Sequence, residues 1–261
     1  AIQGGRMAAA CKAPVLALVI SDVTGDDPTH IASGPCAPDP TTYDDALAII
    51  SRYQVKAPGA VMDILQKGKT GKLKETPKPG DSLFRKVENR VIATAHNSLA
   101  AAAKYFRQHG FKSVVLGDTI TGEAREVAKV LGALARQIRI HNQPWKPPVA
   151  LISGGETTVT VKNNGRGGRN GELLLSLAMD LNGLKNVYAL SCGTDGSDGT
   201  ENNAGAMITP DTMKRAADYG VKAEKLLAHN DSYSFFEALK DLVVTGPTRT
   251  NVNDIHVILV L

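Results

Sequence analysis

The sequence predicts an α/β fold in which a mostly parallel sheet is covered by helices on both faces. Two observations indicate this fold. Short apolar runs typical of buried strands, such as residues 149–153 and 187–191, alternate with amphipathic helical segments. Polar, glycine-rich segments directly follow several of these runs. Strands alternating with helices are typical of a doubly wound sheet, and ligands bind at the carboxyl ends of its strands.

The first part of the chain begins with a predicted central strand. Residues 15–20 are all apolar, as in a strand buried on both faces, and the polar segment 21–28 follows them. Pro40 and Thr42 introduce a helix that reaches about Ile50, and residues 58–66 predict a second helix. Residues 67–82 contain many lysines, glycines and prolines, so we expect an exposed linker there. Residues 1–82 are therefore predicted to form one domain with its linker.

Residues 83–261 predict a second α/β domain. Further strands are expected at residues 91–93, 114–116, 149–153, 187–191 and 255–261, with a partly exposed strand at 157–161. Helices are expected at residues 97–109, 122–138, 171–181, 212–219 and 231–239. Thr121 is expected to cap the second of these, whose apolar residues between Ala124 and Ile138 recur at spacings of three and four.

Three polar segments follow predicted strands and could carry chemistry: residues 21–35, 153–170 and 192–200. Arg169 begins a helix, where its guanidinium and the helix N-terminus would both favour an anion. Asp22, Asp195 and Asp198 could hold Mg²⁺ or orient a hydroxyl group. Glycines let backbone amides approach a phosphate closely. The candidate ligand-binding residues in these segments are Gly34, Ser153, Gly154, Gly155, Glu156, Gly167, Gly168, Asn170 and Thr194.

Each of these features also has a purely structural interpretation. A glycine cluster between a strand and a helix is often only a tight turn, and a single Asp there is more often a helix cap than a metal ligand. Arg166 fits a solvated loop residue, and His96, His109 and His229 fit polar or capping groups near helix ends. Three such segments at the same sheet edge favour a functional site over isolated turns.

Composition and motifs exclude several classes of protein. Hydrophobic residues make up 43% of the 261 residues and charged residues 21%, as in a globular protein, and the net charge of +4 is too diffuse for a nucleic-acid surface. The longest apolar stretch, residues 14–20, is far shorter than the ~20 residues of a membrane helix. The three cysteines show no zinc-binding or disulfide spacing, which fits a cytoplasmic protein. The P-loop motif is absent, residues 165–170 miss the third glycine of the dinucleotide fingerprint, and residues 195–198 do not fit an EF-hand.

Four stretches of the sequence carry a resemblance to a known family: SDVTGDDPTHIASGPCAPDPTTYDDAL (residues 21–47), LISGGETTVTVKNNGRGGRNGELLLSLA (151–178), LSCGTDGSDGTENNAGAMI (190–208) and residues 248–254. In these stretches the sequence resembles the MOFRL-type glycerate 2-kinases, a family whose members are often labelled hydroxypyruvate reductases. The resemblance implies two Rossmann-like domains of mixed, mostly parallel sheet, with the active site in the cleft between them and a MOFRL region at about 149–261. It implies phosphoryl transfer from ATP, with Mg²⁺, to D-glycerate, giving 2-phosphoglycerate.

The resemblance also assigns roles to residues. Arg169 would bind phosphate or the substrate carboxylate, and Asp195 and Asp22 would bind metal or activate the hydroxyl, with Asp198 as a further metal ligand. The family carries a preceding segment with a catalytic lysine, so this chain is expected to correspond to the C-terminal portion. A homodimer is left open, and no nucleic acid or membrane is expected as a partner.

Two other functions stay open at this point. One is an NAD(P)H-dependent hydroxypyruvate reductase, which the family label favours, although none of the six histidines stands in a loop suited to protonating an alkoxide. The other is an inactive protein that only binds nucleotide or glycerate.

Overall fold

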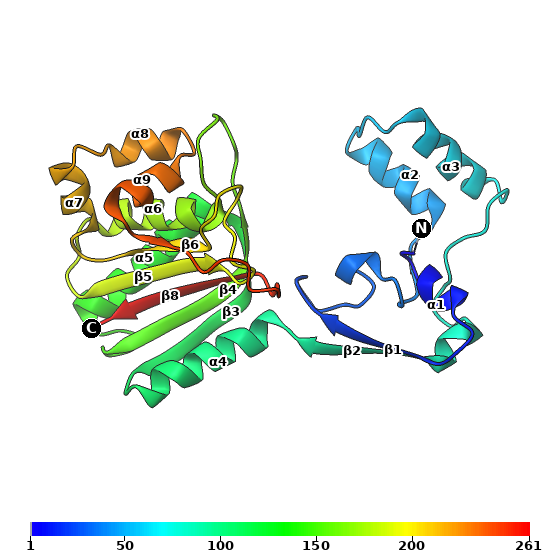
Figure 1. Ribbon diagram of the computed structural model, residues 1–261, viewed down its shortest axis with the longest axis horizontal. Helices are drawn as coiled ribbons and strands as arrows, with labels where there is room; N and C mark the ends of the chain where they lie inside the picture. Colours follow the sequence, from blue (N-terminus) through cyan, green and yellow to red (C-terminus); the bar gives the residue numbers. More distant parts are fainter. Residues whose placement is uncertain (1) are drawn as a thin grey trace. The chain divides into compact units, whose positions relative to one another are not determined.

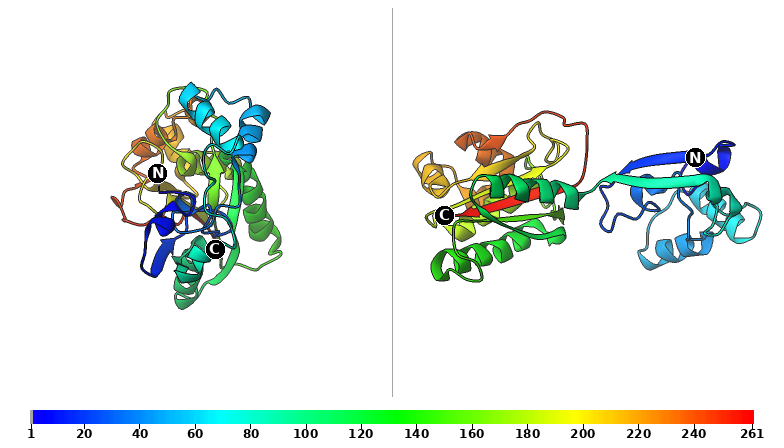
Figure 2. Two further views of the ribbon diagram at one scale, coloured as in Figure 1. Left: turned by 90° about the vertical axis from the view of Figure 1, so that its right-hand side faces the viewer. Right: turned by 90° about the horizontal axis from the view of Figure 1, so that it is seen from below.

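The computed structural model describes residues 2–261, which divide into two compact units. The first unit ends at Ile92, and the second begins at Ala93. The sequence places this boundary earlier, after residue 82. The difference arises because β2 (Val87–Ala93) follows the linker but pairs with β1 (Val15–Ile20) of the first unit. Figures 1 and 2 show each unit from several directions.

The first unit combines a two-stranded sheet with short helices. Its other elements are α1 (Arg6–Ala10), η1 (Ile31–Ser33), α2 (Tyr43–Arg52), α3 (Gly59–Lys69) and η2 (Ser82–Lys86). α2 begins at a capping box: the Thr42 hydroxyl accepts a hydrogen bond from the amide of Asp45, and the Asp45 carboxylate accepts one from the amide of Thr42. α3 lies against α2 at Gly68, where a side chain would overlap the ring of Tyr43. The two predicted helices of this segment are therefore confirmed.

β1 is not buried on both faces, so this prediction is wrong. Within the described residues β1 pairs with β2 alone, and its side chains alternate between half-buried and exposed. Leu16 and Leu18 are 53% and 59% exposed. A continuous apolar run therefore does not distinguish a strand at the centre of a covered sheet from one with a single neighbour.

The second unit is built on a six-stranded sheet in the order β3-β4-β8-β5-β6-β7. Its strands are β3 (Lys112–Glu123), β4 (Val149–Thr158), β5 (Val187–Gly193), β6 (Gly205–Ile208), β7 (Leu242–Val243) and β8 (Asp254–Val260). β3 and β4 pair in parallel, whereas β8 lies between β4 and β5 and is antiparallel to both. β5 with β6 and β6 with β7 are also antiparallel.

The mixed α/β character is confirmed, but parallel pairs are fewer than the sequence predicts. The reason is that the last strand of the chain enters the middle of the sheet between two strands that run the other way. Residues 157 and 158 are the end of β4 and do not begin a separate strand.

One face of this sheet is covered by α4 (Ala95–Gln108), visible below the sheet in Figure 1. Leu99 and Ala103 of α4 form a small core with Ala150 and Ile152 of β4. None of the helices in the described part of the chain is long and apolar enough to cross a membrane.

The opposite face carries the larger core and the remaining helices (Figure 1). They are α5 (Ala124–His141), α6 (Arg169–Leu181), α7 (Thr212–Asp218), α8 (Ala223–Ala228) and α9 (Ser232–Leu239). The periodic positions predicted for α5 include Ala124, Leu131 and Ile138, all of which are buried in this core. The prediction that Thr121 caps this helix is wrong, because β3 continues to Glu123 and α5 begins after it. α6 is buried along most of its length, so its first turn is held firmly at the edge of the sheet.

Candidate active site

Three neighbouring strands bring the polar loops of the second unit to one edge of the sheet. β4 and β5 run in the same direction, because each is antiparallel to β8. Asp254, the first residue of β8, pairs with Gly155 on one side and Gly193 on the other. The carboxyl ends of β4 and β5 therefore meet the beginning of β8. Ligand sites of α/β sheets form at such edges.

A hollow of about 420 Å³ lies at this edge. It is lined by Thr157, Val159, Val161, Gly165, Gly167, Gly168, Arg169, Glu172, Asp195, Ser197, Asp198, Gly199 and Asn230. Five predicted site residues share it: Gly167, Gly168, Arg169, Asp195 and Asp198. The Thr157 hydroxyl is buried and has no hydrogen-bond partner within the described residues.

Arg169, the first residue of α6, is held by two carboxylates. Its Nε and Nη2 atoms donate to Oδ2 and Oδ1 of Asp254, at 2.6 and 3.0 Å, and its Nη1 donates to Glu156 at 3.0 Å. The Asp254 side chain is 0% exposed, whereas that of Glu156 is 51% exposed. Burial acts to lower the pKa of Arg169, but the hydrogen bonds and charge of Asp254 outweigh it and raise that pKa. The guanidinium is therefore charged at the edge of the hollow.

Asp198 caps the N-terminus of α6. Its two carboxylate oxygens accept hydrogen bonds from the amides of Asn170 (2.9 Å) and Gly171 (2.8 Å). Burial raises the pKa of Asp198, and the bonds from these amides oppose that change. Gly168 must be a glycine here, because a Cβ atom would stand 2.3 Å from Oδ1 of Asp198. The helix end expected to receive an external anion thus already holds a carboxylate of the chain itself, which favours the capping interpretation of Asp198.

A buried chain of polar side chains runs from this cap into the sheet. Ser191 donates to Oδ1 of Asn170 at 2.5 Å, and its oxygen lies 2.7 Å from Nδ1 of His256. Because the serine has a single proton to donate, Nδ1 of His256 must be the donor in the second bond. Nε2 of His256 is then unprotonated, and it has no partner within the described residues. Burial lowers the pKa of His256 to about 4, so the imidazole is neutral near pH 7.

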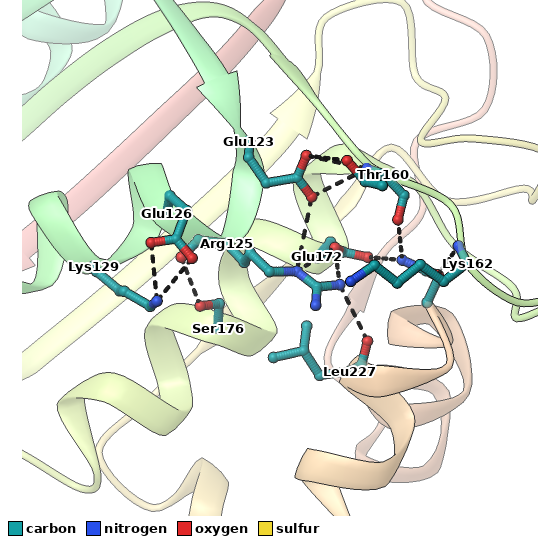
Figure 3. Close-up of polar contacts among 10 residues, drawn as sticks. Glu123, Arg125, Glu126, Lys129, Thr160, Lys162, Glu172, Ser176 and Leu227 are labelled. Carbon is teal, nitrogen blue, oxygen red and sulfur yellow. Dashed lines mark hydrogen bonds and ion pairs between the residues drawn. The ribbon is translucent and has the colours of Figure 1, made fainter.

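The loop between β4 and α6 is fixed at its beginning by the network in Figure 3. Glu123 accepts hydrogen bonds from the amide and hydroxyl of Thr160. Arg125 donates to Oε1 of Glu172 through Nε (3.0 Å) and Nη2 (2.5 Å). Asn230 donates to the other oxygen of Glu172 at 3.0 Å. The buried carboxylate of Glu172 thus stabilises the wall of the hollow on the side of α8 and α9.

Arg166 fixes the far end of the same loop and is more than a solvated residue. Its guanidinium lies 4.2 Å from the centre of the Tyr233 ring and pairs with Glu201 at 2.9 Å. The amide of Tyr233 donates to the carbonyl of Arg166 at 2.9 Å. These contacts attach the glycine-rich part of the loop to the start of α9.

The remaining predicted residues support this edge or lie elsewhere. Ser153, Gly154 and Gly155 are buried in β4, and none of them lines the hollow. Thr194 joins β5 to the entry of β8, because its hydroxyl donates to the carbonyl of Asn253 at 2.6 Å.

Asp22 and Gly34 belong to the first unit. Asp22 is exposed after β1, and Gly34 has a left-handed backbone (φ 62°) that favours glycine. The participation of Asp22 and the site in an interdomain cleft therefore stay predictions.

Several residues at this edge were not singled out from the sequence: Thr157, Glu172, Asn230, Asp254 and His256. For two of these residues, Asp254 and His256, the sequence does contain a signal that could have revealed them. They precede Ile258 and Val260 on the same alternating face of a strand, where a buried acid and a buried histidine are unusual. Glu172 and Asn230 give no such signal, because their contact joins residues 58 positions apart in the sequence.

The fold and this edge define an α/β protein with a charged, glycine-rich ligand hollow. The chain matches the MOFRL family over residues 149–254 and the Domain of unknown function DUF4147 over residues 1–66. A "Glycerate kinase" from Macaca fascicularis is 33% identical over 98% of this chain and 75% of its own length. This chain belongs to that glycerate kinase family.

Other relatives agree with this assignment. A "D-glycerate 2-kinase" from Thermotoga maritima is 38% identical over 100% of this chain. A relative from Agrobacterium vitis that bears a provisional hydroxypyruvate reductase name is 47% identical over 99% of this chain. The chain spans 60% of the length of the former and 66% of the latter. The crystal structure of a glycerate kinase from T. maritima superposes with a TM-score of 0.86 at 37% identity, covering 100% of this chain and 60% of that one.

Proposed function

We propose that this protein is a glycerate 2-kinase, which transfers the γ-phosphoryl group of ATP to D-glycerate and releases 2-phosphoglycerate. The observation that carries the proposal is the hollow in the second unit, where Arg169 and Asp195 come together from segments that are far apart in the sequence. The relatives named as glycerate kinases at 33% and 38% identity support the same activity.

Arg169, Gly167 and Gly168 would bind the phosphate groups. The two glycines line the hollow, where their backbone amides would approach a phosphate. A charged guanidinium beside them offsets the negative charge that builds up on the transferred group. Because phosphoryl transfer depends mostly on positioning and charge, the fixed orientation of Arg169 suits this role.

The charges around the hollow fit a requirement for Mg²⁺. Three carboxylates line it, those of Glu172, Asp195 and Asp198, whereas Arg169 is the one arginine among its described lining residues. Two further carboxylates, Asp254 and Glu156, pair with Arg169, and Arg125 pairs with Glu172. A bare triphosphate would be repelled, whereas Mg²⁺ bound to it would neutralise part of its charge.

Asp195 is the residue that would hold this ion. It lines the hollow, is partly exposed, and uses Oδ1 to accept a hydrogen bond from the amide of Ser197 at 2.9 Å. One carboxylate together with phosphate oxygens is a common protein contribution to a magnesium site. Asp198 fits less well, because both of its oxygens already accept hydrogen bonds from α6. Within residues 2–261, no group of three His, Cys, Asp or Glu side chains is arranged around a common metal position.

The test is product identification with the full-length protein, ATP, Mg²⁺ and D-glycerate, followed by ³¹P NMR. We expect a signal for 2-phosphoglycerate. Arg169→Ala should lower kcat/KM by about 100-fold or more, while the protein still unfolds cooperatively. The exposed Arg107 of α4 provides the control: Arg107→Ala removes the same charge away from the hollow and should turn over normally. Near-normal turnover by Arg169→Ala would count against the proposal.

A hydroxypyruvate reductase is the second candidate function, because the relative from A. vitis bears that name. A reductase needs an acid that protonates the new alkoxide. None of the described residues that line the hollow is a histidine, and His256 is buried in β8 with its Nδ1 atom 2.7 Å from the Ser191 hydroxyl. Mixing the protein with NADH and hydroxypyruvate and following nicotinamide absorbance separates the two activities. Binding of ATP in calorimetry without turnover of either substrate would instead indicate a protein that only binds its ligand.

A further inference from the structure

The most distinctive contact in the hollow is the one that holds Arg169 in place. Asp254 contacts two of the three guanidinium nitrogens through both of its oxygens, at 2.6 and 3.0 Å. This two-point contact fixes the plane of the guanidinium, which a single hydrogen bond cannot do. The geometry leaves Nη1 as the one nitrogen that Asp254 does not bind.

Asp254 itself has no freedom to move. Its side chain is fully buried at the first position of β8, between Gly155 of β4 and Gly193 of β5. Its carbonyl also lies so near β4 that a Cβ atom on Gly154 would stand 2.7 Å away. The absence of a side chain at Gly154 therefore lets β4 pack closely against Asp254.

The third contact of Arg169 is of a different kind. Glu156 accepts from Nη1 at 3.0 Å, but its side chain is half exposed and bonds to no other described side chain. An exposed ion pair of this sort is weak, worth at most about a fivefold factor in an equilibrium. A ligand phosphate or carboxylate can therefore replace Glu156 at Nη1, whereas it cannot replace the buried, bidentate Asp254.

We propose that Asp254 is the positioning residue for Arg169, and that Glu156 is a displaceable counter-ion on the nitrogen that receives the anionic ligand. The inference deepens the proposed function and rests on it for its kinetic test. It assigns the two carboxylates opposite effects on activity, although each carries one negative charge beside the same guanidinium.

The kinetic test compares Asp254→Asn with Glu156→Gln in the full-length protein. Asp254→Asn should lower kcat/KM by about 10- to 100-fold, as expected when a residue that orients a functional group is lost. Glu156→Gln should lower KM for the anionic substrate that binds Nη1, either MgATP or D-glycerate, by about two- to fivefold, because a neutral amide competes less well for Nη1. If the removal of a negative charge alone mattered, kcat/KM would change in the same direction in both variants, and that result would overturn the proposal.

A double-variant cycle separates positioning from a merely structural role. If Asp254 acts through Arg169, Asp254→Asn should add no further loss of kcat/KM in an Arg169→Ala background. A loss that simply adds to that of Arg169→Ala would show that Asp254 acts on activity in some other way, and would contradict the proposal.

A spectroscopic test needs neither turnover nor the Asp254 variant. In a ¹H–¹⁵N spectrum of the wild-type protein, the Nε–H signal that disappears in Arg169→Lys belongs to Arg169. A proton held by buried Asp254 should exchange with water far more slowly than that of exposed Arg107. Exchange as fast as that of Arg107 would overturn the positioning role. If glycerate is not phosphorylated but the proton is protected, only the proposed function fails.

Discussion

Acidification should destabilise the second unit through His256, which is buried and neutral. Its pKa is lowered from 6.5 to about 4, chiefly by burial, with the charge of Asp254 opposing the shift and that of Arg169 adding to it. The unfolded chain therefore binds a proton on this histidine at a higher pH than the folded chain does. Where the unfolded state binds more protons, stability rises with pH. The contribution of His256 is complete above about pH 6.5 and is lost as the pH falls towards 4.

The size of the effect follows from the two pKa values. A shift of this size corresponds to roughly 3 kcal/mol in all. At pH 5, most of the unfolded chains but few of the folded ones would carry the proton, so about 2 kcal/mol of the unfolding free energy should already be lost relative to pH 8. Asp198 has a raised pKa and acts in the opposite direction, so a matched variant is needed to isolate the histidine.

The assay is urea unfolding at pH 8 and pH 5, followed by the fluorescence of Trp145. This is the one tryptophan of the sequence, and it packs against the larger core, so it reports the second unit. His256→Gln keeps a polar side chain beside Ser191 but does not titrate. The loss of unfolding free energy between the two pH values should be smaller in this variant by about 2 kcal/mol. An equal loss in the wild type and the variant would refute the explanation.

Two further predictions concern stability. Arg125→Met leaves the buried carboxylate of Glu172 without its counter-ion and should lower the unfolding free energy of the second unit by about 3–5 kcal/mol. The double variant with Glu172→Gln should recover much of that loss, and no recovery would show that the charge is not the cause. Gly68→Ala places a Cβ atom about 2.2 Å from the ring of Tyr43 and should destabilise the first unit by about 1–3 kcal/mol in calorimetry. Gly59→Ala, in the same helix but with open space around it, should be neutral or stabilising, and equal losses in both variants would contradict the steric reason.

Local patterns of the sequence predicted the longer helices and several strands well, but they did not predict α1 and α8, which have five and six residues. α5 formed where apolar residues recur at helical spacing, because one face of that helix packs into the larger core. β4 formed from the apolar run at residues 149–153, which is indeed buried. β6 and β7 were not predicted, because strands of four and two residues are too short to show a period. The place of β8 between β4 and β5 could not be read from the sequence either, because pairing partners far apart in the chain leave no local signal.

In the candidate site, too, local patterns were predicted from the sequence, whereas contacts between distant residues were not. Arg169 and Asp195 were predicted from loops that follow strands, and the two residues do line one hollow. The role of Asp254 was not predicted, because its contact with Arg169 joins residues 85 positions apart and depends on the register of β8. Asp198 was expected to bind metal or a hydroxyl, and the contact that its carboxylate makes with α6 became visible only when the loop was placed against that helix.

The most direct test of the account is a calorimetric titration of the full-length protein with ATP and Mg²⁺, in the wild type and in Arg169→Ala. The account predicts that the wild type binds MgATP and that the variant binds it at least about tenfold more weakly, since a charged hydrogen bond to phosphate is lost. Equal affinity in the two proteins would show that the phosphates bind elsewhere, and would contradict the assignment of this hollow.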